Sequence, residues 1–212
     1  MVMVKICGNT SVKDALKCAE LGADFIGTVV EVPVQTPRKV TADEAAEIVS
    51  AIQPPTGRII VVILRDVEEA VMLYRKIQPD FIQLQGSESI KFVKELRSLI
   101  PCNIIKTIHV GGEASIKEAR KFSRCCDALL LDTPSVQMGG SGVRHDWGIS
   151  RRIAEKVRIP VILAGGLNPE NVVDAIKEVH PYAVDVASGV ESRGKKDYKK
   201  VKKFIRNAKG AA

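Results

Sequence analysis

Short apolar runs alternate with amphipathic segments along the whole chain. The apolar runs have the length of strands, and we expect strands over 2–6, 24–30, 58–64, 81–84, 104–108, 127–131, 159–164 and 184–187. Between them, apolar positions recur with helical spacing and predict helices over 11–21, 41–53, 66–78, 87–99, 113–125, 146–156, from 168 onward, and over 197–208. Such regular alternation is typical of a parallel sheet whose strands are joined by crossover helices.

Several of these helices have recognisable start signals. Thr41 is followed three residues later by Glu44, which is the spacing of a capping box. Asn168 is a suitable N-cap, because its side-chain oxygen can accept an orphan backbone N–H, and Pro169 suits the first helical turn. The stretch from 159 to 172 therefore predicts a strand, a tight glycine turn and a helix N-terminus.

The sequence predicts an α/β fold, namely a single (β/α)8 barrel with parallel strands that occupies residues 1–212 as one domain. A chain of 212 residues fits one well-filled domain and is short for two. Eight strand-helix units without a long insertion favour a closed barrel. An open, doubly wound sheet remains the alternative, because a sequence does not show the order of strands.

Small residues follow the last two predicted strands and suggest an anion site. Gly165 and Gly166 come after the seventh strand, and Ser188 and Gly189 come after the eighth. Glycines let a ligand approach the backbone closely, and N–H groups at a helix N-terminus attract phosphate. In a (β/α)8 barrel the phosphate site commonly forms after strands seven and eight. An ordinary strand-to-helix turn without a ligand is the alternative.

Composition and charge narrow the class of protein. The chain is 45% hydrophobic and 27% charged, with a formal net charge of +7. Much of the positive excess lies in the predicted last helix, which we interpret as a solvated face, so we expect no nucleic-acid partner. No apolar run is long enough to span a membrane, and five cysteines without paired spacing suggest a reducing, cytoplasmic setting with no metal site.

The active site of a (β/α)8 barrel lies at the carboxyl ends of its strands, and this rule selects candidate residues. Cys7 ends the first strand, and Lys5 shares its face, so a nearby ammonium would lower the pKa of the thiol. Asp132 ends the sixth strand, where burial would raise its pKa and suit it to general-acid work. The alternatives are a small buried residue for Cys7 and a turn cap for Asp132. The other polar residues selected in this way are Arg38, Gln83, Gln85, Asp185 and Ser188.

Five motifs, in this order, resemble the phosphoribosylanthranilate isomerase family. They are Lys5-Ile6-Cys7-Gly8, Leu130-Leu131-Asp132-Thr133, Gly139-Gly140-Ser141-Gly142 with Asp146-Trp147, the stretch from Ala164 to Val172, and the stretch from Val184 to Glu191. The resemblance spans nearly the whole chain. It implies a (β/α)8 barrel and an Amadori rearrangement in tryptophan biosynthesis, in which N-(5-phosphoribosyl)anthranilate becomes 1-(2-carboxyphenylamino)-1-deoxyribulose 5-phosphate. It implies no cofactor and no metal.

The resemblance also implies roles for individual residues. Cys7 matches the general base that takes the proton from C2 of the sugar, and Asp132 matches the general acid that protonates the ring oxygen. Arg38 matches the arginine that faces the anthranilate carboxylate, Asp185 matches a carboxylate near the anthranilate nitrogen, and Gln83 is a further expected substrate-binding residue. The expected phosphate cradle consists of Gly142, Gly165, Gly166, Ser188 and Gly189.

The sequence departs from the family pattern in the half that would hold the anthranilate. Thr28 and His145 stand where aromatic residues are usual, Gln85 replaces a histidine, and the loop before Arg38 is about two residues longer. Two other functions stay open at this point: a non-catalytic barrel that binds a phosphate ligand, and an isomerase of a different phosphosugar amine. We expect the protein to act on a small phosphorylated substrate as a monomer or homodimer, with no membrane contact.

Overall fold

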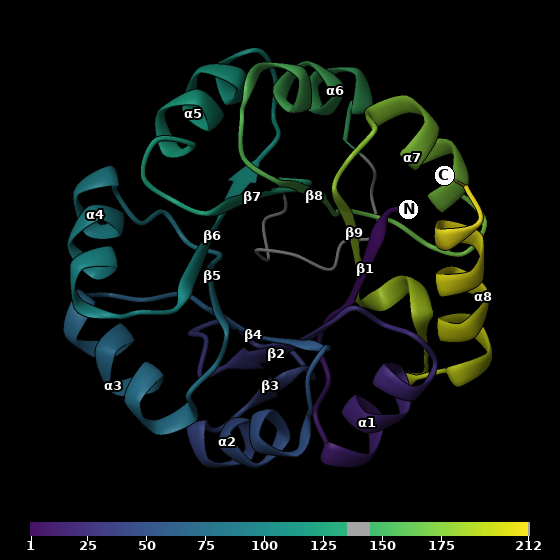
Figure 1. Cartoon of the computed structure of the whole chain (residues 1–212), viewed down its shortest axis with the longest axis horizontal. Coiled ribbons are helices and arrows are strands. Elements are labelled where there is room, and N and C mark those ends of the chain that lie inside the picture. The colour runs from purple at the N-terminus through teal and green to yellow at the C-terminus, as the bar shows by residue number, and fades with distance from the viewer. Residues whose placement is uncertain (135–144, 212) are drawn as a thin grey trace.

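The computed structural model describes residues 1–134 and 145–211, which form a closed barrel of parallel strands within a ring of helices (Figure 1). In the sheet, β1 pairs with β9 on one side and β2 on the other, and this second pairing closes the barrel. The expected (β/α)8 barrel is therefore confirmed over the open sheet. Its eight described strands are β1 (Met3–Ile6), β2 (Phe25–Val30), β4 (Gly57–Val62), β5 (Phe81–Leu84), β6 (Asn103–His109), β7 (Ala128–Asp132), β8 (Val161–Leu163) and β9 (Ala183–Val186).

A helix follows each barrel strand, so every crossover places a helix on the outside of the barrel. Side-chain caps at Ser11, Thr41, Asp66, Asp146 and Asp197 start helices at the expected places, and Thr41 and Glu44 form the complete capping box. In the described part of the chain, none of the helices is long and apolar enough to cross a membrane. The helices are α1 (Val12–Glu20), α2 (Ala42–Ala51), α3 (Val67–Ile77), α4 (Ile90–Leu99), α5 (Ala114–Phe122), α6 (Trp147–Lys156), α7 (Val172–Val179) and α8 (Tyr198–Lys209).

The structure corrects the expected start of three helices. Asn168 does not cap α7; its side chain accepts from the N–H groups of Glu170 and Asn171 in a separate turn, and α7 begins only at Val172. The helix expected from 87 begins at Ile90, capped by Ser89, because that serine accepts the N–H of Phe92. The expected helix 113–125 is shorter at both ends, since α5 covers Ala114–Phe122.

Three short strands and one 3-10 turn escaped the sequence analysis. β3 (Lys39–Val40) adds to the carboxyl end of β2, so the loop before it is tied to the barrel rim. After β9, the turn η1 (Ser188–Val190) leads into a hairpin of β10 (Glu191–Ser192) and β11 (Lys195–Lys196). These two-residue strands lack the apolar alternation that reveals longer ones.

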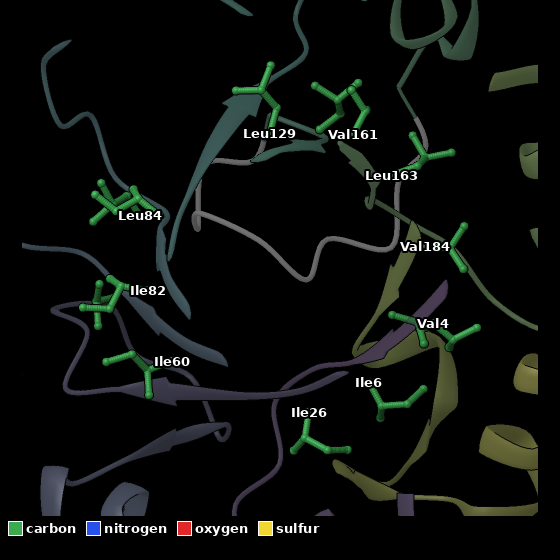
Figure 2. Packing of buried hydrophobic residues seen from close by; sticks show 14 of the residues in the cluster. Val4, Ile6, Ile26, Ile60, Ile82, Leu84, Leu129, Val161, Leu163 and Val184 are labelled. Atoms are coloured by element: carbon green, nitrogen blue, oxygen red, sulfur yellow. The ribbon is translucent and has the colours of Figure 1, made fainter. Parts of the chain in front are cut away.

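The core has two parts because successive side chains of a strand point to opposite faces of the sheet. Figure 2 shows Val4, Ile26, Ile82, Leu129 and Val184 pointing out of the barrel, where they pack with the larger apolar cluster under the helices. A smaller cluster fills the inside of the barrel near the amino ends of the strands, and Phe25 and Phe81 meet there edge to face, 5.7 Å between ring centroids. Its buried members are Ile59, Ile105, Ala128, Leu130, Ile162, Ala164 and Ala183.

Above this apolar floor the interior becomes polar. Four polar side chains are buried on the same inward faces, two residues nearer to the carboxyl ends of their strands: Lys5, Gln83, Thr107 and Asp185. The alternation of β1, β5, β6 and β9 therefore builds a polar layer in the middle of the barrel, directly below the rim where an active site is expected.

A second buried charge lies on the other face of β6. The ammonium of Lys106 is 3.0 Å from Glu88 Oε2 and donates to the carbonyl oxygen of Gly86 at 2.6 Å. Both side chains are almost fully buried, 2% and 1% exposed, so each charge depends on the other for compensation.

We therefore expect Lys106→Met to lower the free energy of unfolding by ~3–5 kcal/mol, because it leaves the Glu88 carboxylate buried without its cation. Urea denaturation measures the loss. The double variant Lys106→Met, Glu88→Gln is the matched control and recovers most of the stability. Equal destabilisation in the single and double variants would contradict this account.

Candidate active site

An open cavity lies at the carboxyl ends of the strands, where the active site of a (β/α)8 barrel is expected. Five predicted site residues line it together: Cys7, Arg38, Gln83, Asp132 and Asp185. The remaining described walls are mostly apolar and come from Val29, Val32, Val34, Val61, Ile63 and Leu130.

Cys7 follows β1 and is held against β9, because its N–H donates to the carbonyl oxygen of Val186 at 2.8 Å. Gly27 makes room for the thiol: a Cβ at this position would lie 2.9 Å from Cys7 Sγ. Lys5 lies on the same face, as alternation predicts. Burial nevertheless raises the pKa of the Cys7 thiol, and Lys5 opposes that rise only in part. The expectation of a lowered pKa was therefore wrong.

Asp132 ends β7 and faces the cavity. Its Oδ1 accepts the N–H of Thr133 at 2.8 Å, and its Oδ2 accepts from Gln85 Nε2 at 3.1 Å. Burial raises the pKa of this carboxyl, with a further upward contribution from Asp185, while the two hydrogen bonds oppose the rise. The direction agrees with the sequence analysis and favours a carboxyl group that can carry a proton.

Asp185 on β9 is held by the buried ammonium of Lys5, 3.1 Å from its Oδ2. Its second oxygen, Oδ1, is buried and has no hydrogen-bond partner among the described residues. Since a buried carboxylate oxygen normally accepts a hydrogen bond, Oδ1 is suited to accept an N–H from a bound ligand.

Lys5 also begins a row of hydrogen bonds that leads to Asp132. Its ammonium donates to Gln83 Oε1 at 2.8 Å, Gln83 Nε2 donates to Gln85 Oε1 at 2.8 Å, and Gln85 Nε2 donates to Asp132. Thr107 joins from the side, where its hydroxyl donates to Gln85 Oε1 at 2.9 Å. Gln85, a departure from the family pattern, is thus in direct contact with an expected catalytic group.

Arg38 lies at the cavity edge, and its orientation is set from the far end of the chain. Its Nε and Nη2 donate to the two carboxylate oxygens of Glu191 at 2.9 and 2.7 Å. Lys196 also contacts Glu191 at 2.7 Å and donates to the carbonyl oxygen of Cys7 at 2.6 Å. The three side chains carry a net charge of +1, and Arg38 is the one of the three that lines the cavity.

Glu191 and Lys196 were missed as site residues by the sequence analysis. Glu191 does close one of the motifs quoted for the family resemblance, and its place just after a Ser-Gly turn was the available signal. Burial disfavours the charged form of Glu191, but Arg38 and Lys196 together hold the pKa of its carboxyl below the usual value. Glu191 therefore acts as an anionic clamp on Arg38.

The expected phosphate residues gather in two turns after β8 and β9. Gly165 and Gly166 have positive φ angles of 83° and 67°, which favour glycine. A Cβ on Gly189 would collide with the carbonyl oxygen of Leu167, so the two turns are in close contact. Among the described residues, the N–H groups of Gly166, Ser188 and Gly189 donate no backbone hydrogen bond. Gly142 lies outside the described residues.

Of the other departures from the family pattern, neither Thr28 nor His145 is among the described residues that line the cavity. His145 lies behind Thr133: its Nδ1 is 3.1 Å from Thr133 Oγ1, and its Nε2 is 2.6 Å from Ser150 Oγ. The longer loop does reach the cavity, through Val32, Val34 and Thr36. Within 1–134 and 145–211, no three His, Cys, Asp or Glu side chains are grouped so as to hold a metal ion.

Comparison with known proteins identifies the family of this chain. The family model for N-(5'-phosphoribosyl)anthranilate (PRA) isomerase matches residues 4–207. A relative from Methanocella arvoryzae, named N-(5'-phosphoribosyl)anthranilate isomerase, is 49% identical over 97% of both chains. The phosphoribosylanthranilate isomerase of Thermotoga maritima is similar in structure, with a TM-score of 0.89 and 37% identity over 99% of this chain and 100% of that one.

A further solved structure adds a ligand to the comparison. It is a phosphoribosylanthranilate isomerase in complex with reduced 1-(o-carboxyphenylamino)-1-deoxyribulose 5-phosphate. Its TM-score is 0.86 at 36% identity, and the match covers 99% of this chain and 100% of that one. These matches span almost the whole length of both chains.

His145 generates a prediction about stability. Burial lowers the pKa of His145 from 6.5 to about 4, so the unfolded chain binds a proton between these pH values while the folded protein does not. The free energy of unfolding should therefore fall as the pH drops from about 6.5 to about 4, by at most ~3 kcal/mol from this residue.

The matched variant is His145→Gln, which keeps a neutral hydrogen-bonding side chain between Thr133 and Ser150. Urea denaturation at a series of pH values should show a flatter acid limb for the variant than for the parent. Parallel curves over this range would rule out a neutral, buried His145.

Proposed function

This chain belongs to the N-(5'-phosphoribosyl)anthranilate isomerase family, and from that premise we propose how its own residues carry out the rearrangement. The protein is an isomerase of tryptophan biosynthesis. We assign its chemistry to the cavity at the carboxyl ends of the strands, with Asp132 as general acid and Cys7 as general base. The observation that carries this assignment is that both side chains face one cavity, in which burial raises the pKa of Asp132 and Lys5 opposes part of the rise in the pKa of Cys7.

The first step opens the sugar ring. Asp132 donates its proton to the furanose oxygen, the bond between this oxygen and C1 breaks, and the nitrogen lone pair forms a C1=N double bond. A raised pKa keeps a proton on Asp132 at a pH where an exposed aspartate would have lost it.

The second step moves the unsaturation along the sugar. Cys7 as thiolate takes the proton from C2, the electron pair forms a C1=C2 bond, and the C1=N bond becomes an amine. The enol hydroxyl at C2 then loses its proton while C1 gains one, which gives the ketone. Over the whole sequence the substrate gains two protons, at the ring oxygen and C1, and loses two, from C2 and the enol hydroxyl. Lys5 favours the thiolate locally, because its ammonium lies on the same face of β1.

The anthranilate part of the substrate fits the side of the cavity that carries Asp185 and Arg38. The unpartnered Oδ1 of Asp185 can accept the N–H of the anthranilate nitrogen. The guanidinium of Arg38, held by Glu191, presents net positive charge to the carboxylate. Apolar walls from Val29, Val61 and Leu130 suit the aromatic ring.

The phosphate fits the turns after β8 and β9. The N–H groups of Gly166, Ser188 and Gly189 can donate to phosphate oxygens. The positive φ of Gly165 and Gly166 favours glycine, which has no side chain to block the approach of a phosphate. We keep Gly142 in this proposal on the family resemblance alone. As for assembly, a relative from Thermotoga maritima is described as dimeric, and we propose a monomer or homodimer here.

This cavity could instead bind a phosphate ligand without catalysis, or isomerise a phosphosugar amine that carries no anthranilate. Complementation of a tryptophan auxotroph that lacks the isomerase separates these alternatives from our proposal. Growth supports the full reaction. Binding of a phosphate ligand without growth would support a non-catalytic barrel or an isomerase of another phosphosugar amine.

We expect Cys7→Ser and Asp132→Asn each to lower kcat by at least about a hundredfold, since general acid-base groups contribute ~10²–10⁴-fold. Binding of the reduced product analogue should change little, because both variants keep size and shape. Because one group acts protonated and the other deprotonated, the parent rate should fall at both pH extremes. A Cys7→Ser variant that folds and turns over near the parent rate would remove Cys7 from the mechanism.

We expect Arg38→Met to weaken binding of the reduced product analogue by ~1.5–3 kcal/mol, the range for a hydrogen bond to a charged group. Binding of ribose 5-phosphate, which lacks the carboxylate, is the comparison and should change little. Glu191→Gln is the matched control: it keeps Arg38 but weakens the ion pair that holds the guanidinium in place, so we expect a smaller loss of binding. Equal losses for both ligands would show that Arg38 does not read the carboxylate.

A further inference from the structure

Residues on or beside three strands, β1, β5 and β7, form one continuous row of buried hydrogen bonds that runs across the barrel. It starts at Lys5 on β1, passes through Gln83 and then Gln85 beside β5, and ends at Oδ2 of Asp132 on β7. Lys5, Gln83 and Gln85 are all buried, and the carboxyl group of Asp132 ends the row at the cavity. The reaction steps above give no role to Gln83 or Gln85.

The chemistry of the two ends sets the direction of every bond in this row. An ammonium can only donate, so Gln83 must turn its oxygen toward Lys5 and its NH₂ group toward Gln85. Gln85 must then turn its oxygen toward Gln83 and its NH₂ group toward Asp132. Thr107 supports the same arrangement, because its hydroxyl donates to the oxygen of Gln85.

This fixed direction restricts where Asp132 can carry a proton. A proton on the lone pair of Oδ2 that faces Gln85 would point at an NH₂ group. Reversing Gln85 would bring its NH₂ group against that of Gln83, and reversing both amides would set an NH₂ group against the ammonium of Lys5. The acidic proton is thereby confined to the other lone pairs of the carboxyl group, one of which on Oδ1 already accepts the N–H of Thr133.

We propose that Gln85 is a positioning residue for the general acid: through the row that begins at Lys5, it excludes the proton of Asp132 from the protein side and leaves it on the side of the substrate. The proposal rests on the proposed role of Asp132. It assigns a function to the glutamine that distinguishes this chain from the family pattern, and it makes Gln83 part of the same device.

The row also limits how far burial raises the pKa of Asp132. Burial is the largest upward cause, and Asp185 from β9 adds to it. The N–H of Thr133, His109 from β6 and Gln85 from β5 act in the opposite direction. Among the described residues, Cys7 after β1 and Arg38 at the rim are the other titratable or charged groups that line the cavity, and Lys5 on β1 is paired with Asp185.

The first test measures the titration of the Asp132 carboxyl group directly, by NMR of protein labelled with ¹³C in the aspartate side chains. The resonance is identified by its loss in Asp132→Asn. In Gln85→Leu the titration midpoint should move upward by about one pH unit or more, because the carboxylate loses a hydrogen bond. Thr107→Val is the matched control: it removes a hydroxyl from the same cluster but leaves the bond to Asp132, so the midpoint should stay near that of the parent.

The second test cuts the row without touching Asp132. Gln83→Leu changes no charge, and no hydrogen bond joins Gln83 to Asp132, but the change frees Gln85 to reverse and accept a proton from the carboxyl group. The midpoint should again move upward. An unchanged midpoint in Gln83→Leu, or an equal shift in Thr107→Val, would overturn the proposal, because packing alone would then explain the cluster.

These measurements use the free enzyme and do not depend on turnover. If Asp132→Asn retained full activity, the proposed catalytic role would fail, while the carboxyl titrations would still decide whether the row controls the proton. Should Gln85→Leu not fold, the ¹⁵N-labelled amide of Gln85 in the parent protein gives the same answer. Its resonance should follow the titration of Asp132, and a resonance independent of pH would count against the proposal.

Discussion

The ammonium group of Lys5 lies inside the barrel with no exposure to solvent, and its compensation organises the polar interior. An unpaired buried charge is costly, so carboxylate and amide oxygens must surround it. Asp185 supplies one from β9 and Gln83 supplies another from β5, which ties three strands together through one nitrogen atom. Because Gln83 and Asp185 also line the cavity, the interaction that satisfies Lys5 shapes the floor of the active site.

The interior of the barrel is divided along its axis, and this division controls acid-base behaviour. Apolar side chains near the amino ends of the strands, including Phe25 and Phe81, form the apolar floor of the interior. The polar layer above is enclosed by the barrel wall, so the pKa values of Cys7 and Asp132 both rise with burial. The rise in pKa favours the protonated acid form of Asp132. It opposes the thiolate form of Cys7, so the positive charge of Lys5 is needed to stabilise that thiolate.

The rim is assembled from segments that are far apart in the chain. Glu191 holds Arg38 from the hairpin after β9, and Lys196 joins the same carboxylate to the backbone of Cys7. The solved relatives share this fold over almost their full lengths, and in this chain the Gln85 amide donates to Asp132. The Gln85 amide therefore connects Asp132, through Gln83, to the buried ammonium of Lys5. An amide does not titrate, so it can keep one orientation as the pH changes.

The amino-acid sequence by itself determined the α/β class, eight strand-helix units and most of the helix starts. Caps such as Thr41 with Glu44 act within one turn, so neighbouring residues carry the information. The strand-end rule also found Cys7, Asp132 and Asp185. Only the tertiary structure decided that β1 closes onto β2, that Glu191 clamps Arg38 across 153 positions, and that Lys5 meets Asp185 across 180. It also decided the direction of the pKa shift of Cys7. Burial depends on the whole enclosing barrel, and contacts between distant segments leave no periodic pattern in the chain.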